Sequence, residues 1–195
     1  LYNTHKDSYS KRAICHGHTS FITHLDFSND SKFLQSNSGD YELLFWDTSG
    51  THITAAARMR DTQWATWSCT LGWPVQGIWP QVTHDLTDIN SVSRNSQHDL
   101  LVTGDDFGCV KLFRFPALTP HSAEKKYLGH SSHVTNVRFT FGDTHVISAG
   151  GRDRCIFQWR CDLEELENED DESDVEHLAS HPEADDSFNT DEDND

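Results

Sequence analysis

The side chains of this 195-residue chain that could carry chemistry are histidines at the start of a recurring phrase. Residues 17–27 read GHTSFITHLDF, and residues 129–139 read GHSSHVTNVRF. Cys15 and His16 precede the first copy, and the resulting CHGH could suggest zinc ligands. A zinc site takes four ligands at structured spacing, and no second candidate pair lies nearby in the sequence. We therefore expect no metal site here.

Catalytic motifs do not account for the histidines either. The sequence has no Gly-x-Ser-x-Gly elbow, no phosphate-binding P-loop and no His-Glu-x-x-His motif. Asp105 and Asp106 form a carboxylate pair, but they stand between two predicted strands, where a solvated turn is the ordinary interpretation. We expect a protein that is not an enzyme and that needs no cofactor.

Each phrase opens a longer repeat with conserved spacing between its anchors. Asp40 and Trp46 lie six residues apart, as do Asp153 and Trp159. The opening histidine and the closing tryptophan are 28 residues apart in one repeat and 29 in the other. Fixed spacing of several anchor types indicates one structural unit repeated along the chain.

The segments between the anchors predict short strands joined by tight turns. KFLQSNSGDYELLFWD and HVISAGGRDRCIFQW each indicate a strand, a Gly/Asp turn and a second strand. A third copy at 85–115 has Asp85 in the place of the histidine, with His84 before it, and Phe113 in the place of Trp46. The fold class that follows is all-β.

The length of the repeat and its Gly-His…Trp-Asp signature resemble those of WD-repeat propeller blades. In such blades the histidine bonds an Asp of a later turn, and a Ser/Thr hydroxyl and the Trp indole complete the network. A buried imidazole needs such partners, because an unsatisfied polar group costs about 1–3 kcal/mol. We expect two structural networks: His18, Ser38, Asp40 and Trp46; and His130, Asp153 and Trp159, with Gly151 where Ser38 stands.

This pattern predicts about three four-stranded blades, near residues 14–50, 58–116 and 127–160, within a body of residues 1–161. Propellers usually have 4–8 blades, so we expect an incomplete propeller. The opening LYNTHKDSYSKRAIC looks like the outer strand of a preceding blade. Residues 162–195, rich in charge and poor in apolar side chains, predict a disordered acidic tail.

The charge distribution limits the classes of partner. The formal charge is −17, yet the segment 161–195 holds 17 Asp or Glu and no Lys or Arg, so the body is neutral. Without a basic cluster we expect no nucleic-acid partner, and without an apolar run of about 18 residues we expect no membrane span. Five scattered cysteines fit reduced thiols in the cytosol.

Several longer segments are more specific than a generic WD repeat. WATWSCTLGWPVQGIWP, TDINSVSR and GDDFGCVKLFRFP, with the two Gly-His phrases, resemble the end of the echinoderm microtubule-associated protein-like family over about residues 1–160. The resemblance implies two joined propellers, of which this stretch closes the second. It also implies tubulin and microtubules as partners, a cytoplasmic, cytoskeletal location and a scaffold role. The family's N-terminal coiled coil and basic region are not in this sequence.

Two other functions remain open beside the microtubule-associated scaffold. One is a general WD-repeat adaptor without tubulin contact, and the other is an acidic-tail chaperone of basic proteins. Four tryptophans fall within residues 64–79, where an outer strand and a packed insertion would account for them. Alternatively, Trp73 and Trp79 could form a partner surface, because clustered tryptophans are common at binding hot spots.

Overall fold

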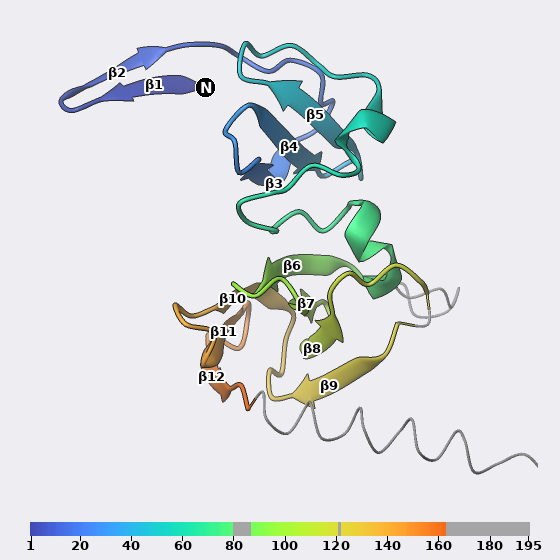
Figure 1. The fold of residues 1–195 in the computed structure, drawn as a ribbon. Coiled ribbons are helices and arrows are strands. Elements are labelled where there is room, and N and C mark those ends of the chain that lie inside the picture. The colour runs from blue at the N-terminus through green and yellow to red at the C-terminus, as the bar shows by residue number, and fades with distance from the viewer. Residues whose placement is uncertain (80–86, 121, 163–195) are drawn as a thin grey trace, which may run out of the picture. The chain divides into compact units, whose positions relative to one another are not determined.

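The computed structural model describes residues 1–79, 87–120 and 122–162 (Figure 1). Residues Leu1–Cys161 form one unit. Beyond Asp162, the predicted acidic tail lies outside the described residues, as do His84 and Asp85 of the third copy. No helix of the described residues has the length and the apolar character to cross a membrane.

Antiparallel strands dominate these residues, which confirms the predicted all-β class. A separate hairpin is followed by three sheets, which we call the first, middle and last blades, and within each sheet every strand pairs with its neighbours in the sequence (Figure 1). The hairpin has β1 (Tyr2–His5) and β2 (Ser8–Lys11); the first blade has β3 (Ile22–Phe27), β4 (Phe33–Ser38) and β5 (Leu43–Asp47); the middle blade has β6 (Ile89–Arg94), β7 (Leu100–Asp105), β8 (Cys109–Arg114) and β9 (Glu124–Leu128); the last blade has β10 (Val134–Phe139), β11 (His145–Gly150) and β12 (Ile156–Arg160).

The strand register shows that the three blades are copies of one unit. In each, the inner strand carries one irregularity near its start, between Ile22 and His24, between Ile89 and Ser91, or between Val134 and Asn136. The closing aromatic of each blade pairs with the second-strand residue at the same position: Trp46 with Leu34, Phe113 with Leu101 and Trp159 with Val146.

The described blades differ from the expected four strands. Only the middle blade has a fourth strand among the described residues, and in the first blade an extended segment substitutes for one. There His52 forms a bridge with Trp46, and the Ile53 N–H donates to the Phe45 carbonyl at 2.8 Å. The opening residues, expected as one outer strand, instead fold back on themselves as the exposed hairpin β1–β2.

Alternation along the strands builds two hydrophobic layers between neighbouring blades. Val102 and Val110 of the middle blade pack with Val137 and Val146 of the last blade. Val92 and Val137 hold the same register position and are fully buried, whereas Leu25 at that position in the first blade is 51% exposed. No described sheet covers that face of the first blade.

After the extended segment of the first blade, residues 54–79 form an insertion between the first and middle blades, with two short 3-10 helices, η1 (Ala56–Met59) and η2 (Trp73–Ile78). The buried Asp26 carboxylate of β3 holds the insertion. It accepts hydrogen bonds from the Thr66 hydroxyl, from the Ser68 and Cys69 N–H groups and from the Gln35 amide. Burial alone would raise the pKa of Asp26, but these hydrogen bonds together lower it.

Candidate functional site: two polar relays

The last blade contains a complete chain of hydrogen bonds through its histidine. The Trp159 indole N–H donates to Ser148 Oγ at 2.8 Å, and Ser148 Oγ lies 2.8 Å from His130 Nε2. His130 Nδ1 lies 2.8 Å from the Asp153 carboxylate. An indole N–H can only donate and a carboxylate can only accept, so the relay assigns the His130 proton to Nδ1. We call this chain the last relay.

The acidic end of the last relay is enclosed. The exposed fraction of the side chain is 0% for His130 and 3% for Asp153. Burial would raise the pKa of Asp153, but the hydrogen bond from His130 and the N–H groups of Cys155 and Ser131 lower it. Phe157 packs edge-on against the imidazole, with ring centroids 4.6 Å apart.

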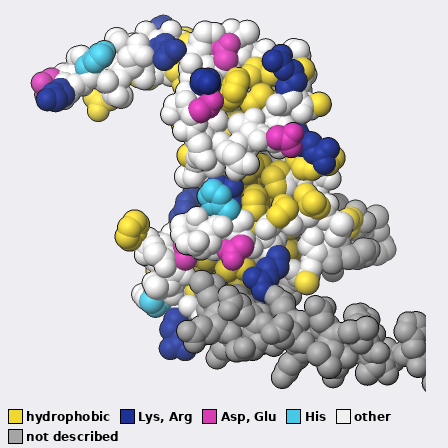
Figure 2. Space-filling model, in the orientation of Figure 1, with side chains coloured by type: hydrophobic (Ala, Val, Ile, Leu, Met, Phe, Trp, Pro, Cys, Tyr) yellow, Lys and Arg dark blue, Asp and Glu magenta, His cyan; other side chains and the backbone are white. Residues whose placement is uncertain are grey.

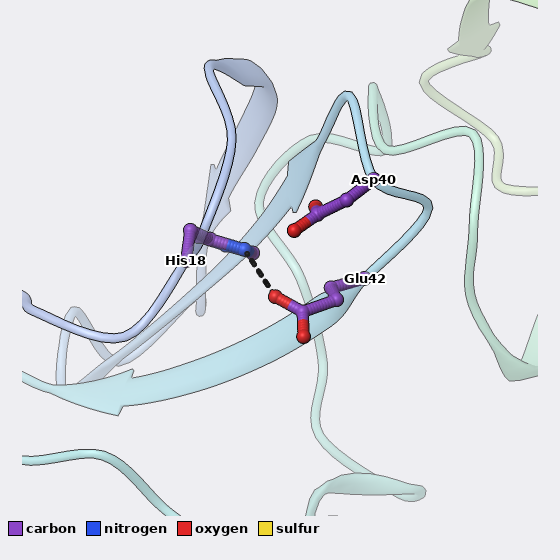
Figure 3. A group of neighbouring side chains, drawn as sticks. All are labelled: His18, Asp40 and Glu42. Carbon is purple, nitrogen blue, oxygen red and sulfur yellow. Dashed lines mark hydrogen bonds and ion pairs between the residues drawn. The ribbon is translucent and has the colours of Figure 1, made fainter.

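The first blade has the corresponding chain, which we call the first relay. The Trp46 indole N–H donates to Ser36 Oγ at 2.9 Å, and Ser36 Oγ lies 2.8 Å from His18 Nε2. The other ring nitrogen, Nδ1, lies 3.4 Å from the carboxylate of Glu42 (Figure 3). The Glu42 side chain is 42% exposed, so this end of the relay is open to water.

The serine and the acid of the first relay differ from those that the sequence predicted. The serine is Ser36 rather than Ser38, because the imidazole reaches the residue paired with Leu44, inside the sheet, and not the strand end. Ser38 instead donates its hydroxyl to Asp40.

Because its carboxylate bonds to Ser38, Asp40 is not the acidic partner of His18. Its second carboxylate oxygen accepts a hydrogen bond from the Thr19 hydroxyl, and Glu42 takes the place of Asp40 at the histidine. In the last blade Gly150, rather than Gly151 as the spacing predicted, holds the register position of Ser38; it offers no hydroxyl, which leaves Asp153 available to His130.

His18, Asp40 and Glu42 also meet the geometric requirement for three metal ligands, since one atom of each lies within 4.8 Å of the others (Figure 3). The ring nitrogens of His18 and both Asp40 oxygens, however, already have protein partners. This arrangement is that of a hydrogen-bonded turn, which needs no ion to satisfy its polar atoms.

The middle blade lacks most of the relay. Thr103 occupies the position of Ser36 and Ser148, and its buried hydroxyl has no hydrogen-bond partner among the described residues. Phe113 replaces the tryptophan. In its turn, Asp105 was expected to be solvated, yet it is buried and accepts the N–H groups of Phe107 and Cys109 at 3.0 and 2.9 Å; only its neighbour Asp106 is exposed.

The two tryptophans predicted as a partner surface have different environments. Trp73 begins η2, is 50% exposed and lies under the Arg60 guanidinium, with 4.4 Å from Cζ to the ring centroid. Trp79 is half-buried, donates its indole N–H to the Thr70 carbonyl at 2.9 Å and packs edge-on against Tyr41. The structure therefore does not bring them into one exposed patch as a pair of free rings.

Spacing could have identified the serines that the sequence reasoning missed. Ser36 and Ser148 both follow their histidine by 18 residues, so they belong to the same repeat pattern. Glu42 gives no such signal, because its role depends on how the neighbouring turn is occupied.

The comparisons with known proteins agree with the repeat. A family model described as the second β-propeller of echinoderm microtubule-associated protein matches residues 1–161. Similar proteins include mouse "Echinoderm microtubule-associated protein-like 1", 52% identical over 153 residues, and rat "Echinoderm microtubule-associated protein-like 2", 51% identical over 152 residues. The "77 kDa echinoderm microtubule-associated protein" of Lytechinus variegatus is 51% identical over 152 residues.

These alignments cover most of this chain but only a small part of each relative. They cover 78%, 77% and 77% of this chain, respectively, but 19%, 23% and 23% of the relatives. The chain therefore spans about a fifth of the length of the curated relatives that it matches.

Proposed function

Because this chain belongs to the echinoderm microtubule-associated protein family, through that family's second β-propeller, we propose that its blades act as a non-enzymatic scaffold that contacts tubulin. The observation that carries the proposal is the match over residues 1–161 together with about one-half identity to relatives named for microtubule association. A cytoplasmic, cytoskeletal location follows from the same proposal.

The two relays support a structural role for the histidines in this scaffold. Each relay ties the loop before the inner strand to the second strand and to the closing tryptophan, through side chains that are largely buried. No freely accessible nucleophile or base is left over in the relay, because both imidazole nitrogens have partners. The relays thus fix the loops at the ends of the strands, and the loops are the part that meets a partner.

Co-sedimentation with microtubules tests this function. The chain and a version ending at Cys161 are pelleted with polymerised tubulin at about 0.05 M and about 0.15 M salt, after circular dichroism has established that both are folded. We expect saturable pelleting of both versions. The shorter version should bind at least as tightly, because the acidic segment 162–195 repels the acidic microtubule surface.

Two outcomes would favour the other functions. If both folded versions stay in the supernatant, the blades are a general adaptor surface without tubulin contact. If the longer version binds histones and the shorter one does not, the chain is an acidic-tail chaperone of basic proteins.

A further inference from the structure

A groove in the insertion provides a second, separate site. It has a volume of about 790 Å³ and lies where the insertion packs between the first and middle blades. Figure 2 shows hydrophobic side chains gathered over η2 at this level of the molecule. The apolar lining includes Leu43, Phe45, Met59, Trp67, Trp73 and Phe115.

Of the tryptophans in the lining, Trp73 is half-exposed and presents ring surface to a ligand, whereas Trp67 is buried in the floor, 4% exposed. The Trp67 indole N–H donates to the Cys69 carbonyl at 2.9 Å, and its ring packs at a tilt against Phe115. A Cβ on Gly72 would lie 2.5 Å from Cζ2 of Trp67, so only glycine allows the chain to pass this ring. The apolar floor is therefore preformed and closely packed.

Two guanidinium groups give the groove its polarity. Arg94 is half-buried, lies over the Phe115 ring with 5.3 Å from Cζ to the centroid, and donates from Nη2 to the Trp64 carbonyl at 2.7 Å. Within the described residues this is its one hydrogen bond, and no carboxylate forms an ion pair with it. Exposed Arg60 lies over Trp73, and Asp61 beside it is the one acidic residue of the lining.

A guanidinium has five N–H donors, and a planar carboxylate takes two of them at once. Burial lowers the pKa of Arg94, with a smaller opposing effect from the Asp26 carboxylate, so a charged group at this place gains from an added anionic partner. The groove thus combines an apolar surface with a cation that has no carboxylate partner among the described residues.

We propose that this groove binds an acidic peptide segment of a partner protein, with a Glu or Asp carboxylate on Arg94 and an adjacent apolar side chain against the exposed part of Trp73. A second acidic side chain reaches Arg60 at the rim. This site goes beyond the proposed tubulin scaffold and does not depend on it, because every element of the groove lies inside the described chain.

Fluorescence anisotropy with two labelled peptides tests the proposal on the full chain. The probe is acetyl-Glu-Leu-Glu-Glu-amide, and its uncharged counterpart is acetyl-Gln-Leu-Gln-Gln-amide. We expect the acidic probe to bind and Arg94→Gln to weaken it by about ten-fold or more, the size of one charge-assisted hydrogen-bonded pair. Arg60→Gln should weaken it by about three-fold, because an exposed charge contributes less.

Arg152→Gln is the matched control, since Arg152 is exposed and does not line the groove; it should leave binding unchanged. Near-ultraviolet circular dichroism checks that each variant is folded. If Arg94→Gln does not fold, Arg60→Gln and Trp73→Ala decide, because both residues are exposed and both should weaken the probe.

Three results would overturn the proposal. The first is equal binding of the acidic and uncharged peptides, which would make the groove a purely apolar site. The second is undiminished binding by the folded arginine variants. The third is self-association of the chain that Arg94→Gln abolishes while the probe binds neither form, since a second copy would then be the occupant. Microtubule pelleting can succeed or fail in each case, so the two proposals are judged separately.

Discussion

The first and last blades contain the same relay, but opposite ends of it are shielded from water in the two blades. In the last blade the imidazole and its carboxylate are buried, at 2.8 Å. In the first blade His18 meets a half-exposed Glu42 at 3.4 Å. The indoles show the reverse: Trp46 is 1% exposed beneath His52 and the segment 51–53, whereas Trp159 is only half-buried.

This difference shows which part of the relay the fold requires. The two hydroxyls and their distances are nearly identical, because they lie inside regular strands in the same register. The acidic residue of the relay lies in a turn, and the residues that cover the indole lie after the third strand. Both of these can vary while the serine, the histidine and the indole stay fixed.

The largest loss of stability is expected for a substitution of Asp26. This buried carboxylate of β3 has no counterpart in the last blade, where Arg138 of β10 holds the same register position. Asp26→Asn should lower the free energy of unfolding in urea at about pH 7 by about 3 kcal/mol, since it leaves buried N–H donors without a charged acceptor. Asp30→Asn, in the turn after β3, keeps a side-chain oxygen for its local donors, and because this side chain is 47% exposed it serves as a milder reference.

The same substitution should change the pH dependence of stability. Because hydrogen bonds hold the folded pKa of Asp26 below its unfolded value, its contribution is fully present above the unfolded pKa, near 3.9, and is lost as the pH falls through the folded pKa. Urea titrations from about pH 7 to about pH 3 should therefore be flatter for Asp26→Asn than for the unchanged chain. Equal slopes would mean that this carboxylate is not held in its charged form.

The histidines give the next effect. His130→Leu removes a hydrogen bond of Asp153 and leaves the buried Ser148 hydroxyl without its imidazole acceptor, so it should lower the free energy of unfolding more than His18→Leu, which leaves Glu42 free to reach water. Urea denaturation of both variants measures the difference. Equal losses would contradict the unequal closure of the two relays.

Substitutions of the tryptophans should cost more stability in the first blade than in the last, the reverse of the order expected for the histidines. Trp46→Phe should cost about 2 kcal/mol and Trp159→Phe about 1 kcal/mol, because the more buried indole loses more packing along with its bond to the serine. Phe113 shows that a blade of this chain tolerates phenylalanine at the position. A larger loss at Trp159 would contradict this account.

The smallest effect is expected for the turn residue that diverts Asp40. Ser38→Gly removes the competing hydroxyl and makes the first turn resemble that of the last blade, where Gly150 holds this position. We expect stability to change by a few tenths of a kcal/mol, since the gain at His18 offsets the added backbone freedom. Glu42→Gln should then be better tolerated in the Ser38→Gly background than alone, which a double-mutant cycle measures.

The repeat could be predicted from the sequence because its anchors are local and regularly spaced. His18, His130 and the closing tryptophans followed from spacing alone, as did the third copy with Phe113. Ser38 was wrong by two residues, because strand alternation places Ser36 and Ser38 on the same face and spacing to a glycine-rich turn does not choose between them.

Other features depended on contacts that no local pattern contains. Asp26 binds groups 40 to 43 residues further along the chain, and Arg94 reaches a carbonyl 30 residues before it. These contacts exist because the insertion folds back on the first and middle blades, which only the three-dimensional structure specifies.

The central claim is that the Gly-His histidines are parts of structural relays, and nitrogen NMR of their imidazole rings tests it most directly. With ¹⁵N-labelled chain at about pH 7, we expect His130 to carry its proton on Nδ1, in slow exchange, with Nε2 as an acceptor. His18 should show the same tautomer with faster exchange, because its acidic partner is exposed. A proton on Nε2 of His130, or rapid averaging of its two nitrogens, would contradict the relay.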